Sequence, residues 1–202
     1  MDKCIDKMER RIISYPKGSA FVVSDFTDLM SYETAKKAIV KLAKSKKIRH
    51  VIRGVYDNPS YSSLLQEFTA PKPNEIAKAL ARNYNWNITV SGDAALNMLG
   101  LSTQVPANWC YISSGPYKKY EMGKVSIEFK HRADKSISGM SEKTAMLIQA
   151  IKTIGKGKMS PSTIQTISQR FSPEEKKTIL AESRKTTVWI YEIIKKICKE
   201  MN

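Results

Sequence analysis

The feature that most constrains the fold is a change of hydrophobic period between residues 31 and 59. In SYETAKKAIVKLAKSKK the apolar residues recur every three or four positions, which predicts an α-helix that begins after Ser31 and buries one face. Those apolar positions are Ala35, Ala38, Ile39, Leu42 and Ala43. The next stretch, IRHVIRGVYDNP, places β-branched and aromatic residues around Gly54, so it predicts a β-hairpin that ends at Asn58 and Pro59.

The residues before this helix predict three shorter elements. The first is a helix that ends before Pro16 and has Ile5, Met8, Ile12 and Ile13 on one face. A short strand is expected over Ser19–Val23, followed by a short helix over Asp25–Met30 that Ser24 caps. The order helix, strand, helix, helix, hairpin is that of a winged helix-turn-helix, which we expect over residues 1–60.

The rest of the chain predicts an α+β unit over residues 61–138 and a helical part over residues 139–202. The α+β unit is expected to contain a helix around Ile76–Ala81 and strands at Asn87–Val90, Trp109–Ser113 and Lys124–His131. The helical part is expected to contain a helix face over 146–154, a mobile linker at 152–161, a capping box at Ser172–Glu175, and a last helix with Val188, Tyr191, Ile194 and Cys198 on one face. The expected fold class is therefore α+β, with a winged helix-turn-helix first and helices last.

Net charge narrows the class of partner. The chain has 34 Lys and Arg against 19 Asp and Glu, a net charge of +15, which favours a polyanion, usually nucleic acid. No apolar run reaches the ~20 residues of a membrane-spanning helix, and the charged N-terminus lacks the apolar core of a secretory signal. The three cysteines lie far apart and predict reduced thiols. We expect a cytoplasmic protein without a membrane partner, and a monomer in solution.

The polar face of the helix after Ser31 is the best candidate for a binding site. In a winged helix such a helix enters the major groove with its first residues at base edges, while lysines nearer its end meet phosphates. Arginines of the hairpin suit the minor groove or its flanking phosphates. The expected DNA-binding residues are Tyr32, Thr34, Lys36, Lys37, Lys41, Lys44, Lys47, Arg49 and Arg53. Taken alone, this lysine-rich face is more typical of a solvated surface, and the hairpin that follows it favours DNA binding.

The sequence lacks the motifs of catalysis. It has two histidines, no glycine-rich phosphate loop and no paired Asp residues suited to two metals. We therefore expect no enzymatic activity and no catalytic, cofactor-binding or metal-binding residues. The SGD triplet at residues 91–93 is interpreted as a helix start, where Ser91 or Asp93 caps free N–H groups and Gly100 closes the helix. An anion at this helix N-terminus is the alternative.

Two stretches make the chain resemble a known family, the AbiEi antitoxins of type IV abortive-infection toxin–antitoxin systems. They are the wing IRHVIRGVYDNP after the lysine-rich helix, and SGDAALNMLGLSTQVP followed by WCYIS. The resemblance covers about residues 5–135. It implies an N-terminal winged-helix DNA-binding domain and an antitoxin domain, here residues 61–138, with its helical C-terminal part at residues 139–202.

The resemblance also implies a function. Such a protein represses its own two-gene operon by binding inverted repeats in double-stranded promoter DNA, and counteracts a nucleotidyltransferase-like toxin without requiring a stable complex. By position, the implied DNA contacts are Thr34, Lys36, Lys37, Lys41, Arg49 and Arg53. The alternative is an interaction module that neutralises the toxin in a direct complex, with Trp109, Tyr111 or Trp189 as anchors. Placement in the core is the other interpretation of these three aromatic residues.

Overall fold

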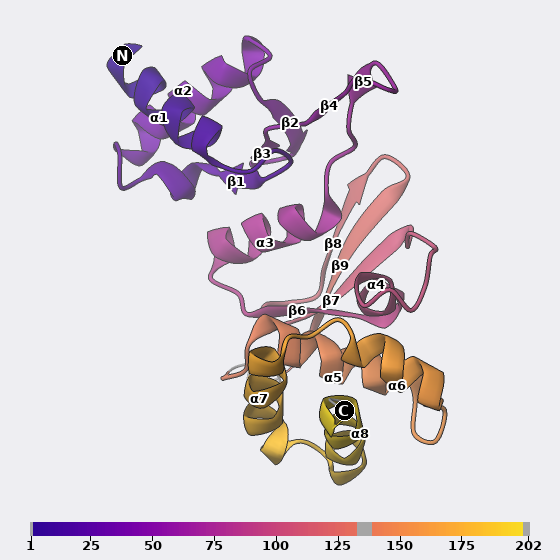
Figure 1. Cartoon of the computed structure of the whole chain (residues 1–202). Coiled ribbons are helices and arrows are strands. Elements are labelled where there is room, and N and C mark those ends of the chain that lie inside the picture. The colour runs from indigo at the N-terminus through magenta and orange to yellow at the C-terminus, as the bar shows by residue number, and fades with distance from the viewer. Residues whose placement is uncertain (1, 133–138, 200–202) are drawn as a thin grey trace. The chain divides into compact units, whose positions relative to one another are not determined.

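The computed structural model describes residues 2–132 and 139–199 and has the expected α+β fold (Figure 1). Its residues cluster into two compact units. The first unit holds the described residues up to Trp86 together with Tyr120–Gly123, and the second holds Asn87–Lys119 and the described residues from Lys124 onward. The main division therefore falls near residue 86, whereas the sequence suggested residue 60. Residues 133–138 and 200–202 of the expected segments lie outside the described residues.

The N-terminal elements of the first unit come in the order that the sequence predicts. They are α1 (Asp2–Ser14), β1 (Ala20–Val22), η1 (Val23–Phe26), α2 (Tyr32–Lys44), β2 (Arg49–Ile52) and β3 (Val55–Asp57). The three strands form an antiparallel sheet in the order β1-β3-β2. Helices α1 and α2 pack against each other over one core, whose largest members include Met8, Ile12, Phe21, Phe26, Ile39 and Leu42.

The short helix expected over Asp25–Met30 is wrong in extent and type. The structure has a 3-10 helix at Val23–Phe26. Val23 and Phe26 are both buried, and a helix with three residues per turn places residues three apart on the same side. Asp25 supports the turn, because its Oδ2 accepts a hydrogen bond of 3.0 Å from the backbone N–H of Val22. Burial of the two apolar residues therefore decided the form of this element.

Helix α2 and the hairpin after it agree with the sequence pattern. The Ser31 hydroxyl caps α2 by accepting the N–H of Thr34 at 3.4 Å. The buried face consists of Ala35, Ala38, Ile39 and Leu42. Strands β2 and β3 turn at Gly54, whose φ of +80° is a conformation that glycine adopts without a steric penalty.

The first unit contains two further features beyond residue 60. A hairpin of β4 (Tyr61–Ser62) and β5 (Glu67–Phe68) was not predicted, because two-residue strands are too short to show an alternating pattern. Helix α3 (Pro73–Tyr84) was predicted, and it packs against β1. Arg82 of α3 reinforces this contact, with Nε 3.0 Å from Asp25 Oδ1 and Nη2 3.0 Å from the Ala20 carbonyl. These contacts explain why α3 belongs with the N-terminal elements.

The second unit combines a sheet with a group of helices (Figure 1). It contains the strands β6 (Ile88–Ser91), β7 (Asn108–Ser113) and β9 (Val125–His131), with helix α4 (Gly92–Met98) between β6 and β7. Strand β8 (Lys118–Met122), of which Tyr120–Met122 cluster with the first unit, completes the strand order β6-β7-β9-β8. Strand β7 is antiparallel to β6 and parallel to β9. The helices are α5 (Glu142–Ile154), α6 (Pro161–Ser168), α7 (Pro173–Glu182), η3 (Ser183–Lys185) and α8 (Val188–Lys199). Strand β8 was missed by the sequence interpretation.

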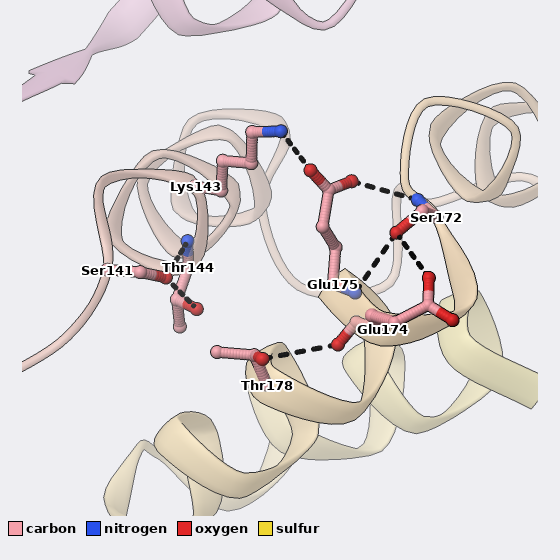
Figure 2. A network of polar contacts seen from close by, with 7 residues as sticks. All are labelled: Ser141, Lys143, Thr144, Ser172, Glu174, Glu175 and Thr178. Carbon is pink, nitrogen blue, oxygen red and sulfur yellow. Dashed lines mark hydrogen bonds and ion pairs between the residues drawn. The ribbon is translucent and has the colours of Figure 1, made fainter.

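The capping box predicted at the start of α7 is confirmed (Figure 2). The Ser172 hydroxyl accepts the N–H of Glu175 at 3.3 Å, and the Glu175 carboxylate accepts the N–H of Ser172 at 2.8 Å. Lys143 of α5 forms an ion pair with Glu175 and thereby joins the two helices. This ammonium group is the largest cause of the lowered pKa of the Glu175 carboxyl.

Three other expectations for the second unit need correction. Ser91 does not cap α4, because its hydroxyl donates to the Cys110 carbonyl at 3.4 Å instead. Val188 does not line the buried face of α8, since its side chain is 75% exposed. The expected linker at 152–161 is the end of α5, a glycine turn and the Ser160 cap of α6. Gly100 does close α4 in the left-handed conformation, with φ +73°.

None of the described helices is long and apolar enough to cross a membrane.

Candidate nucleic-acid interface

The exposed face of α2 carries a row of lysines. Because the opposite face of this helix is held in the core, these side chains point to solvent. We call the four exposed residues Lys36, Lys37, Lys41 and Lys44 the lysine stripe. Their ammonium groups make no hydrogen bond or ion pair with any residue that the structure describes. Four positive charges are therefore available to a partner along one helix face.

The lysine stripe borders a shallow depression on α2. Its lining residues are Glu33, Lys36, Lys37, Val40 and Lys41. They follow the spacing i, i+3, i+4, i+7 and i+8, so they form a single face over about two helical turns of 5.4 Å each. The side chain of Val40 is 39% exposed in the middle of this face. Three of the five lining residues are lysines, so this helix face suits the phosphates of a polyanion.

The first turn of α2 holds the residues expected at base edges. Tyr32 is 51% exposed and Glu33 is also exposed. Thr34 is half-buried, and its hydroxyl lies 2.9 Å from the Ser31 hydroxyl at the helix cap. Tyr32 is therefore available for contact, whereas Thr34 is partly engaged in starting the helix.

The hairpin of β2 and β3 presents one exposed arginine. Arg53 lies at the turn beside Gly54 and makes no side-chain interaction with the described residues. His50 is exposed, and its ring contacts Tyr56 at 5.2 Å between centroids. Tyr56 is 9% exposed, and burial raises the pKa of its hydroxyl. The ring of Tyr56 therefore belongs to the core, which leaves Arg53 as the exposed arginine of this hairpin.

Arg49 lies on the same hairpin but is engaged inside the protein. Its Nε is 3.0 Å from Asp57 Oδ1 and its Nη2 is 2.6 Å from Asp57 Oδ2, and Asp57 is 1% exposed. Its Nη1 also donates to the Thr69 carbonyl at 2.9 Å. The structure thus separates Arg49 from the other expected DNA contacts. The sequence does not specify this pairing, because it depends on the hairpin register, which places Asp57 opposite Arg49.

Lys47 is also partly engaged. It follows α2 and pairs with Glu9 of α1 at 2.7 Å, with its own side chain 51% exposed. An exposed pair of this kind contributes little to stability, so Glu9 can give way to a phosphate at small cost. The expected residues that have no internal partner among the described residues are therefore the lysine stripe, Tyr32 and Arg53.

The other candidate residues from the sequence are placed in the second unit. Trp109 and Tyr111 are 7% and 1% exposed, and Trp189 is half-buried. Trp109 and Tyr111 are thus core residues and cannot serve as surface anchors in this fold. The cysteines Cys4, Cys110 and Cys198 are free, and burial raises the pKa of the Cys198 thiol. Within the described residues, no cluster of His, Cys, Asp and Glu side chains could hold a metal ion.

Comparisons with known proteins give a family match and a distant structural likeness. A family model described as a family of unknown function, DUF6088, matches residues 7–179. None of the curated proteins matches the chain. Among solved structures, the crystal structure of the RV2827C protein from Mycobacterium tuberculosis is 14% identical, covering 96% of this chain and 74% of that chain, with a TM-score of 0.42. A TM-score of this size carries no conclusion about fold or function.

Proposed function

We propose that this chain, which belongs to the DUF6088 family, is a cytoplasmic DNA-binding protein that represses its own promoter and acts as a type IV antitoxin. The observation that carries the DNA-binding part is the lysine stripe of α2, whose four ammonium groups have no partner among the described residues. On a chain with a net charge of +15, such a face is suited to the phosphates of duplex DNA.

The proposed docking places α2 in the major groove and the β2–β3 wing against the adjacent backbone or minor groove. Tyr32 and Glu33 in the first turn would meet base edges, where a carboxylate can accept from the cytosine N4 amino group. The lysine stripe would neutralise phosphates, and Arg53 would contact the minor groove. Arg49 is left out of this contact set, since its guanidinium is already paired with Asp57.

The antitoxin part rests on different support. It follows from the resemblance of SGDAALNMLGLSTQVP and WCYIS to the AbiEi antitoxins. In the proposed scheme the partner is a nucleotidyltransferase-like toxin encoded beside this chain, and the target DNA is an inverted repeat upstream of both genes. A direct complex anchored by Trp109 or Tyr111 is not proposed, because both side chains are buried.

The DNA-binding proposal is tested by the salt dependence of binding. Fluorescence anisotropy would compare the chain's own promoter with a shuffled duplex of equal length. Specific binding should exceed non-specific binding by at least ~10³-fold. Lys37→Ala with Lys41→Ala should weaken binding to both duplexes and reduce the slope of log K against log salt by about 1.8, since each phosphate contact contributes about 0.9.

The matched control is Lys156→Ala with Lys158→Ala, which removes two exposed lysines from the second unit. This control should keep the wild-type slope. Equal affinity for promoter and shuffled DNA would contradict the repressor proposal, and an unchanged slope in the α2 variant would contradict the assigned interface. For the antitoxin part, co-expression with the neighbouring toxin should restore growth, and failure to restore it would remove that part alone.

A further inference from the structure

The hairpin of β4 and β5 carries a group of exposed apolar side chains. In this segment, residues 61–68, which we call the apolar hairpin, Tyr61 is 59% exposed, Leu64 90%, Leu65 65% and Phe68 59%. The remaining exposed large apolar residues of the described chain are at least seven positions apart in the sequence from one another. Single exposed apolar side chains are normal on a protein surface, whereas a contiguous group indicates an interaction site.

Hydrogen bonds hold the two ends of the apolar hairpin together and tie them to strand β2. At its base, Thr69 donates its N–H to the Ser60 carbonyl at 2.8 Å, and Arg49 donates to the Thr69 carbonyl at 2.9 Å. On one face, the rings of Tyr61 and Phe68 pack edge to face at 5.4 Å between centroids. Figure 1 shows the hairpin projecting from the β1-β3-β2 sheet of the first unit. The apolar side chains are thus presented on a defined support.

The strands of the apolar hairpin have open edges. Among the described residues, β4 and β5 pair only with each other. A two-stranded sheet is marginally stable by itself, and its outer edges offer unpaired N–H and C=O groups to another strand. A partner that adds a strand and covers Leu64 and Leu65 would satisfy both the edge and the exposed apolar surface.

The charge of this region indicates which partner fits. Residues 54–71 contain no Lys or Arg, and their charged residues are the buried Asp57 and the exposed Glu67. Nucleic acid or an acidic protein is attracted to the lysine-rich surfaces elsewhere on this +15 chain. A partner that is itself strongly basic is repelled by those surfaces and can approach most closely at a region without positive charge. A second copy of this chain is such a partner.

We propose that the apolar hairpin is the contact through which two copies of this chain associate, edge strand to edge strand about a two-fold axis. Identical antiparallel edges are self-complementary under two-fold symmetry. The patch is small, so the association is weak and concentration-dependent, and the monomer expected from the sequence is the dilute form. The proposal does not depend on DNA binding.

The test is the molar mass of the full chain by analytical ultracentrifugation, from dilute solution to the solubility limit, at low and high salt. We expect a monomer–dimer equilibrium that shifts toward the dimer at high salt, because salt screens the repulsion between two basic chains. Leu64→Ser with Leu65→Ser should weaken dimerisation at least tenfold. Val105→Ser with Val188→Ser is the matched control, since these side chains are 72% and 75% exposed in the second unit, and it should dimerise as the wild type does.

Two further measurements distinguish a dimerisation defect from unfolding and from a loss of DNA binding. Thermal unfolding of each variant should match the wild type, since Leu64 and Leu65 face solvent. If the serine variant unfolds, Leu64→Lys replaces it in the test. The dimerisation defect of Leu64→Lys should diminish as the salt concentration rises. DNA affinity at dilute concentration should be unchanged in the serine variant. The proposal is overturned if the chain stays monomeric under every condition, if the serine variant dimerises normally, or if it loses DNA affinity without a change in mass.

Discussion

At the scale of single residues, two arginines of one hairpin have different roles. Arg49 and Arg53 are four positions apart and look equivalent in the sequence. Arg49 forms a bidentate ion pair with the buried Asp57 carboxylate, whereas the Arg53 side chain is exposed to solvent at the turn. The difference follows from register, because strand pairing places Arg49 directly opposite Asp57.

The first prediction separates these roles. Arg49→Ala should lower the free energy of unfolding by about 3 kcal/mol, because it leaves the Asp57 carboxylate buried without its partner. Arg53→Ala should change that free energy by less than about 0.5 kcal/mol, as expected at an exposed site, while weakening DNA binding. Urea denaturation and anisotropy with promoter DNA measure the two effects. Equal stability of the two variants would contradict the structural role of Arg49.

The second residue-scale prediction concerns Glu182. Burial disfavours its charged form, but hydrogen bonds from Thr144 and Ser141 outweigh burial and lower its pKa overall. A lowered pKa in the folded state stabilises the fold above the ordinary carboxyl value of about 4.3, and this stabilisation is lost as pH falls through the folded value. Glu182→Gln should therefore lose more stability at pH 7 than at pH 3. Urea titrations at both pH values test this, and a pH-independent loss would contradict it.

At the scale of elements, helices were predicted more reliably than strands. The apolar spacing in α2 and α3 extends over three or more turns, so local sequence determines which face is buried. Strands β4, β5 and β8 have two, two and five residues, and their sequences YS, EF and KKYEM show no clean apolar alternation. These strands form because their neighbours are in place, which a local pattern does not contain.

The element-scale prediction tests the start of α7. Ser172→Ala should lower the free energy of unfolding by about 1 kcal/mol, because the N–H of Glu175 loses its acceptor in the capping box shown in Figure 2. Ser172→Gly should cost only a few tenths of a kcal/mol, by the usual ranking of cap residues. Chemical denaturation of the three proteins under one condition gives the order. A larger loss for glycine than for alanine would show that the cap does not stabilise α7.

At the scale of the whole molecule, the boundary between the two units falls after α3 and not at residue 60, where the sequence suggested it. Helix α3 buries Ile76 and Leu80, packs against β1, and pairs Arg82 with Asp25. A fragment of residues 1–86 should therefore fold more stably than one of residues 1–60. Circular dichroism melting of the two fragments beside the full chain measures this. A fragment of residues 1–60 that melts as cooperatively as the longer one would restore the boundary suggested by the sequence.

The sequence by itself determined the α+β class, the long helices, the caps at Ser31 and Ser172, the hairpin at Gly54 and the solvent-facing side of α2. Each of these depends on period, capping chemistry or glycine conformation, which act over a few residues. Tertiary structure alone decided that Arg49 pairs with Asp57, that Ser91 bonds to Cys110, that α3 joins the first unit, and that residues 61–68 form an apolar hairpin. These outcomes depend on contacts between segments distant in sequence or on strand register, which local spacing does not specify.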